Sequence, residues 1–141
     1  MKTALRTVAG VIAGLLVAFA LLAAVEYFSD VLHPLPHDFG GTMEEICQHV
    51  QNYPRWILAV AVPAWGLTAL VSTWTARRIG NLYAAATVGL LLLAALVFNI
   101  SILPYPIWFK IVILLVIPAA IFAGSRLSIR RKTAGPGGAE Q

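Results

Sequence analysis

Between Arg78 and Lys110 the chain reads IGNLYAAATVGLLLLAALVFNISILPYPIWF, residues 79–109, with no charged side chain. A membrane hydrocarbon core is about 30 Å thick and is crossed by a helix of about 20 apolar residues. The segment, 31 residues long, is therefore too long for a single crossing. Pro104 and Pro106 lie near its end, where their missing amide donors interrupt a helix. The segment predicts two transmembrane helices that fold back on each other.

Further apolar runs lie on both sides of this segment. We expect four membrane-spanning helices, at about residues 8–28, 56–76, 82–102 and 107–124. Hydrophobic residues make up 60% of the chain and charged residues only 11%, against about 25% charged residues in a typical soluble domain. The predicted fold is an all-α, integral membrane, four-helix antiparallel bundle, with a short amphipathic helix in its outer loop. Residues 1–129 form this domain, and residues 130–141 are expected to be a basic, Gly/Pro-rich, disordered tail.

The basic residues predict how the bundle sits in the membrane. On an up-down-up-down path, all of the Lys and Arg residues except Arg55 and Lys110 fall on the side that holds both termini and the loop at residues 77–81. Since Lys and Arg accumulate on the cytoplasmic side of membrane proteins, both termini are predicted to be cytoplasmic. The basic residues follow this topology and do not gather on one folded surface, so nucleic acid is not an expected partner.

A secretory signal peptide is the main alternative for residues 1–25. Lys2 and Arg6 give a charged start, and Ala18 to Ala20 form a possible cleavage site. The apolar run covers residues 8–25, which is longer than the roughly 7–15 residues usual in a signal peptide. This length favours a first span that stays in the protein.

The outer loop, residues 29–54, is the only sizeable segment predicted to lie outside the membrane. Thr42 followed by Glu45 is typical of a capping box at the beginning of a helix, which we expect to end near Gln51. Its predicted apolar face follows the spacing of an amphipathic helix and consists of Met43, Ile46, Cys47 and Val50. Cys47 is the only cysteine, so no intrachain disulfide can form, and its place on this face favours an inert thiol.

A stripe of small residues runs along the first span, with Gly10, Gly14 and Ala18 four residues apart. Small residues let two helix backbones approach closely in lipid. Packing inside the same bundle is the favoured interpretation, and dimerisation through this stripe is the alternative.

Three polar residues are predicted to share one layer near the outer surface. Glu26 lies in the last turn of the first span, Asn99 near the end of the third and Lys110 near the beginning of the fourth. A charge at this depth costs a few kcal/mol unless it is paired or reaches water. We therefore expect an ion pair between Glu26 and Lys110 across the bundle, with Asn99 bonded to either.

A divalent metal site at the outer face is a further hypothesis. Carboxylates and imidazoles are good ligands for zinc and related ions. The candidate ligands are Glu26, Asp30, His33, His37 and His49. Their spacing matches no established tight metal motif, and ordinary turn or helix-surface residues are the alternative interpretation.

A series of short motifs resembles a family of small bacterial four-helix integral membrane proteins of unknown function. In order, the motifs are a Gly-rich first span that ends in Glu26, then His33-Pro34-Leu35-Pro36, Ala64-Trp65-Gly66, Arg77-Arg78, Asn99, Pro104-Tyr105-Pro106-Ile107-Trp108, Pro118-Ala119 and Gly124-Ser125-Arg126-Leu127. The resemblance covers nearly the whole chain. It implies a bacterial inner-membrane location and carries over no activity and no catalytic residues.

The sequence favours a non-enzymatic accessory or subunit-type membrane protein. It contains no nucleophile–base pair, phosphate-binding loop or nucleotide motif, and we predict no catalytic residue and no cofactor. The expected partners are the lipid bilayer and a homo-oligomer or larger membrane complex. The alternatives are a small transporter or channel that uses Glu26, Asn99 and Lys110, and an outer-face metal binder.

Overall fold

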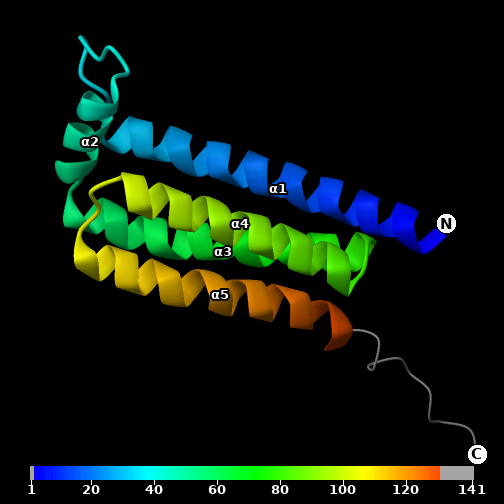
Figure 1. Cartoon of the computed structure of the whole chain (residues 1–141). Helices are drawn as coiled ribbons and strands as arrows, with labels where there is room; N and C mark the ends of the chain where they lie inside the picture. Colours follow the sequence, from blue (N-terminus) through cyan, green and yellow to red (C-terminus); the bar gives the residue numbers. More distant parts are fainter. Residues whose placement is uncertain (1, 131–141) are drawn as a thin grey trace, which may run out of the picture.

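Five helices form the part of the chain that the computed structural model describes, residues 2–130, with side chains described as far as residue 127. They are α1 (Lys2–Leu32), α2 (Met43–Gln51), α3 (Arg55–Ile79), α4 (Leu82–Ile102) and α5 (Ile107–Arg130) (Figure 1). All but the short α2 are long and apolar enough to cross a membrane. The prediction of an all-helical bundle with four apolar spans is confirmed. The tail predicted at residues 130–141 lies outside the described residues, apart from the backbone of Arg130.

The turn between α3 and α4 ends one helix and begins the next within two residues. The Gly80 amide donates to the Ala76 carbonyl over 2.9 Å, which completes the last turn of α3. The Asn81 side chain then accepts from the Ala84 amide over 3.1 Å and caps α4, a role for which Asn is well suited. Asn81 also donates to Thr7 Oγ1 over 2.7 Å. The turn is thereby fixed to the first residues of α1.

The four long helices are arranged as a flattened bundle. α3 packs against α1, α4 and α5, and α4 also packs against α1 and α5. Within the described residues α1 and α5 share no close backbone contact, since α3 and α4 lie between them (Figure 1). The two ends of the bundle are called below the turn end, which holds Gly80, and the α2 end.

The stripe on α1 supplies the buried surface of that helix. Gly10, Gly14 and Ala18 are its buried residues. A Cβ atom placed on Gly10 would lie 2.6 Å from Gly80 Cα, and one on Gly14 would lie 2.8 Å from Ala76 Cβ. The small residues therefore pack inside the bundle, against the end of α3, and beyond Ala18 no residue of α1 is buried.

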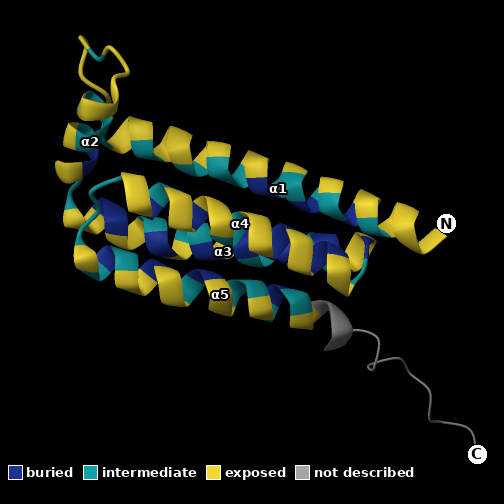
Figure 2. Ribbon diagram, viewed as in Figure 1, coloured by how far each residue is buried: buried dark blue, intermediate teal, exposed yellow. Residues whose placement is uncertain are grey.

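The main core joins α3, α4 and α5. Phe109, Ile113 and Ile117 of α5 are buried in it, together with Leu58 and Val62 of α3. Bulky apolar side chains also cover the outer faces of the long helices, and Figure 2 shows these exposed positions along α1, α4 and α5. Water would disfavour such an apolar surface. Lipid is the surrounding medium that suits it, so the chain is a multi-pass membrane protein.

Candidate functional site

The helix α2 begins at a capping box. Thr42 Oγ1 accepts from the Glu45 amide over 3.3 Å, and Glu45 Oε2 accepts from the Thr42 amide over 3.0 Å. Glu45 Oε2 also accepts from the Gly40 amide over 3.1 Å, and these hydrogen bonds lower the pKa of Glu45. The predicted cap is confirmed, and it fixes the chain that leads from α1 into α2.

A cluster of rings holds α2 over the end of α1. The His33 and His49 rings are stacked with centroids 4.5 Å apart. The centroid of the Tyr53 ring lies 4.9 Å from that of His33 and 5.2 Å from that of His49. The Phe39 and His49 ring centroids lie 6.5 Å apart. Among the described residues α2 has no close backbone contact with another helix. The rings of His33, Phe39, His49 and Tyr53 are called here the ring cluster. Together with the buried Val50, they attach α2 to the rest of the protein.

Burial shifts the ionisation of two members of the ring cluster. Loss of water lowers the pKa of His49, and the neighbouring His33 lowers it further, whereas Asp30 acts in the opposite direction. Burial also raises the pKa of Tyr53, whose hydroxyl lies 2.9 Å from Ser29 Oγ. Neutral His49 and neutral Tyr53 are thus the forms that suit this end of the molecule.

A pocket of about 590 Å³ lies beneath α2. Its walls come mainly from α1 and α3, and α2 contributes Ile46, His49 and Val50. Val60 and Leu67 line the pocket and are also exposed on α3, so it is open along the side of the bundle. A pocket of this size suits a drug-sized molecule.

Most of the pocket lining is apolar. Glu26 and Asp30 bring two carboxyl groups from α1, and the other polar side chains of the lining are those of Ser29, His49, Tyr53, Trp65, Thr68, Asn99 and Tyr105. Trp65 Nε1 and Asn99 Oδ1 are buried and have no hydrogen-bond partner in the described structure. The lining residues, all in the described part of the chain, include no Lys or Arg, and their one imidazole is that of His49, whose pKa is lowered by burial. The pocket therefore offers two carboxyl groups beside an imidazole for which the neutral form is favoured.

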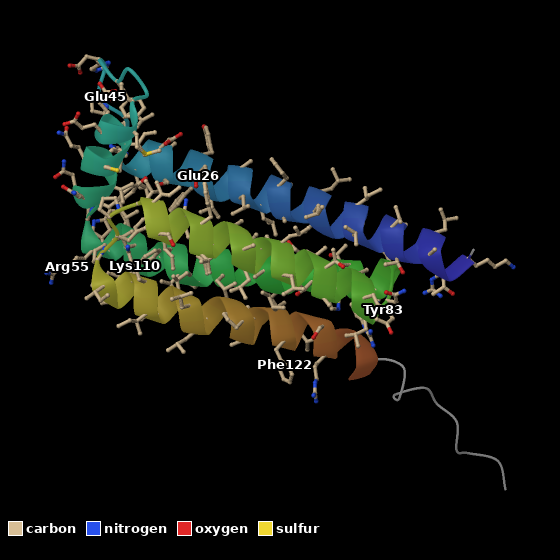
Figure 3. All side chains as sticks on the ribbon, viewed as in Figure 1. Glu26, Glu45, Arg55, Tyr83, Lys110 and Phe122 are labelled. Carbon is tan, nitrogen blue, oxygen red and sulfur yellow. The ribbon has the colours of Figure 1, made fainter. Side chains whose placement is uncertain are left out.

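The predicted polar layer is brought together only in part. Glu26 and Asn99 line the same pocket, but Lys110 does not. Figure 3 shows Glu26 on α1 and Lys110 at the beginning of α5, and these two helices do not pack against each other. The expected ion pair across the bundle is therefore not formed, and Asn99 Oδ1 accepts no hydrogen bond from Lys110.

The candidate metal ligands are also not gathered as a set. His33 and His49 stack, and with Asp38 and Glu45 they line a smaller pocket of about 310 Å³. Glu26 and Asp30 line only the larger pocket, which His49 also lines, and His37 lines neither. Across the described residues no three His, Cys, Asp or Glu side chains are placed to hold a metal ion. His37 belongs to the loop between α1 and α2, which projects beyond the bundle (Figure 1).

Sequence reasoning missed Trp65 and Tyr53 as residues of the pocket. Trp65 lies inside a predicted span, away from either membrane surface, where the indole N–H has no water to bond. That position was a signal that the residue faces the interior of the protein. Tyr53 gives no such signal, because its role depends on Ser29, which lies 24 positions from it in the sequence.

No protein-family model, curated protein or solved structure matches this chain.

Proposed function

We propose that the chain is a bacterial inner-membrane protein with both termini and the turn end in the cytoplasm. The distribution of Lys and Arg supports this orientation, since Arg77, Arg78 and Arg126 share the turn end with Lys2 and Arg6. The motif order that resembles small bacterial four-helix membrane proteins supports the location. In this orientation α2 and the large pocket face the outer side.

Cysteine labelling tests this orientation. Cys47 is replaced by Ser, and a single cysteine is introduced either at Gln48 or at Thr3, both of which are exposed. A membrane-impermeant maleimide should label Gln48→Cys in spheroplasts, and Thr3→Cys only after the membrane is opened. Labelling of Thr3→Cys in intact spheroplasts would contradict the orientation.

We propose further that the protein acts without catalysis, as a small transporter whose working site is the large pocket. The observation that carries this function is that Glu26 and Asn99, from two different spans, line one pocket within the bundle. Ionisable groups inside a span are costly and commonly mark a solute or ion pathway. Lys110 has no place in this site.

The accessory-subunit function is the alternative. In the sequence it is favoured by the absence of a catalytic constellation together with the small-residue stripe, whose Gly10 and Gly14 pack against α3 of the same chain. It is the function that would remain if transport were disproved.

Flux into proteoliposomes tests the transport function. The solutes are H⁺, Na⁺, K⁺ and a set of amphipathic amines, with protein-free liposomes as background. Wild-type protein and Glu44→Gln should carry at least one of them, because Glu44 does not line the pocket. Glu26→Gln should lose that flux. Absence of flux for every solute, or equal flux through Glu26→Gln, would disprove transport through this site.

A further inference from the structure

We infer that the large pocket binds an amphipathic organic cation, with its positive group at Glu26 and Asn99 and its apolar body along α3. This inference names the ligand class of the proposed transport site and, to that extent, rests on the proposed function.

The sign of the ligand's charge follows from the lining. Glu26 and Asp30 lie on the same helix, four residues apart, and both line the pocket. The lining has no Lys or Arg, and burial lowers the pKa of His49, its one imidazole, so an anion would meet repulsion with no cationic partner. A bound cation supplies the opposite charge that Glu26 lacks at this depth.

The second contact for the cation is Asn99. Its Oδ1 atom is buried with no donor in the described structure, and leaving a buried acceptor unpaired costs about 1–3 kcal/mol. A positive group beside Oδ1 satisfies it, either through an N–H donor or through the attraction between a charge and the amide dipole. In this placement the positive group is shared between one residue of α1 and one residue of α4 that line the same pocket.

The apolar part of the ligand fits the wall of the pocket that α3 and α5 form. Ala61, Ala64 and Trp65 of α3 line the pocket together with Phe109 of α5, and the Trp65 and Phe109 ring centroids lie 5.9 Å apart in an edge-to-face arrangement. The small alanines leave space for the apolar body, and the half-buried Trp65, held by its contact with the fully buried Phe109, offers it an apolar surface. The exposed Val60 and Leu67 at the edge of this wall open it toward the membrane. A molecule dissolved in the lipid can therefore enter without crossing the ring cluster.

Equilibrium binding to the full-length protein in nanodiscs tests this inference. Tetraphenylphosphonium is the probe, and tetraphenylborate, which has nearly the same shape and the opposite charge, is its control. Binding is counted as the signal above protein-free nanodiscs. We expect saturable binding of the phosphonium alone. Glu26→Gln should raise its Kd by about tenfold or more, as for loss of one partner of a desolvated charge pair.

Glu44→Gln is the matched control variant, because it removes one carboxylate near the same end of the molecule without touching the pocket lining. It should leave the Kd unchanged. Glu26 is exposed, so its replacement by Gln should preserve the fold, which circular dichroism checks. An unchanged Kd in Glu26→Gln, equal losses in both variants, or equally tight binding of the borate would each overturn the inference.

Binding and flux fail independently. Phosphonium binding that depends on Glu26, without flux of any solute, would keep the ligand class and remove the transport function. Flux that depends on Glu26, without phosphonium binding, would keep transport and remove the ligand class.

Discussion

Gly10 lies where the backbones of α1 and α3 meet. A Cβ atom at this position would lie 2.6 Å from Gly80 Cα and 2.7 Å from the Ala76 carbonyl oxygen. Both are backbone atoms, which cannot move aside as a flexible side chain can. Membrane helices associate through such close backbone packing, because lipid is as apolar as their side chains and provides little hydrophobic force between them. The absence of a side chain at Gly10 is thus a direct source of stability.

We predict that Gly10→Leu loosens α1 and lowers the free energy of unfolding by about 1–3 kcal/mol, the usual cost of overpacking. Unfolding in mixed micelles with increasing SDS measures this change. Ala9→Leu is the control, since Ala9 is exposed on the same helix, and it should change the stability by less than about 0.5 kcal/mol. Equal stability of the two variants would contradict the packing described here.

His49 makes the docking of α2 sensitive to acid. Its pKa is lowered below the ordinary value of 6.5 when α2 is docked, mainly by burial. Well above pH 6.5 both docked and undocked His49 are neutral, so docking does not change with pH there. Below pH 6.5 the undocked imidazole takes up a proton more readily than the docked one, and docking weakens as the pH falls.

Hydrogen exchange of the α2 amides, corrected for intrinsic rates, measures this effect. We expect protection in α2 to decrease from pH 6.5 to pH 5 in the wild-type protein and to stay nearly constant in His49→Gln. The amides of α3 serve as an internal reference. The same loss of protection in His49→Gln would show that another group is responsible.

At the scale of elements, the described contacts between α2 and the other helices are made by side chains. Besides the ring cluster, the contact between Ser29 Oγ and the Tyr53 hydroxyl, 2.9 Å long, joins the last turns of α1 to the link before α3. The two residues are 24 positions apart. The bond therefore closes the α2 end of the large pocket, whose lining includes both residues.

A double-mutant cycle tests this connection. Ser29→Ala and Tyr53→Phe should each destabilise the protein, and the double variant should lose less than the sum, with a coupling energy of about 0.5–1.5 kcal/mol, as for one hydrogen bond. Unfolding in SDS again provides the measurement. Additive losses would mean that the two hydroxyl groups do not interact in the membrane.

The sequence determined the helices better than it determined their neighbours. The spans, the caps and the amphipathic α2 depend on local patterns. The length of each apolar run predicts a span, Thr42 followed by Glu45 predicts the beginning of α2, and Asn81 after Gly80 suits the beginning of α4. The pairing of Glu26 with Lys110 required knowledge of which helices are adjacent. Apolar periodicity does not give that knowledge in a membrane helix, because one face contacts lipid, the other contacts neighbouring helices, and both are apolar. Position along the helices predicted one layer for Glu26, Asn99 and Lys110, but only packing decides which of them line the same pocket, as Glu26 and Asn99 do.

At the scale of the whole molecule, α3 packs against all the other long helices, as α4 also does. It also carries the buried polar residues Thr68, Ser72 and Thr73. Thr68 and Thr73 donate to carbonyls of their own helix, Ala64 and Ala69, whereas Ser72 Oγ is buried with no hydrogen-bond partner in the described structure. Removal of α1 would uncover the end of α3 that now contacts the glycines.

We therefore predict that the protein retains residues 1–25 in the membrane. Intact-mass measurement of the protein purified from membranes should give the full-length chain without loss of an N-terminal segment. A product shortened after Ala20 would show that the first helix is a cleaved signal peptide, and that the contacts of Gly10 and Gly14 are absent from the mature protein.

The one-sided burial of α1 has a mechanical consequence. The helix packs against backbone atoms at the turn end, and beyond Ala18 none of its residues is buried. A tilt of α1 about Gly10 would displace its far end, where Glu26 lies, more than its near end. The Ser29–Tyr53 contact and the ring cluster are the contacts that oppose such a tilt. The width of the large pocket at the α2 end therefore depends on these side chains.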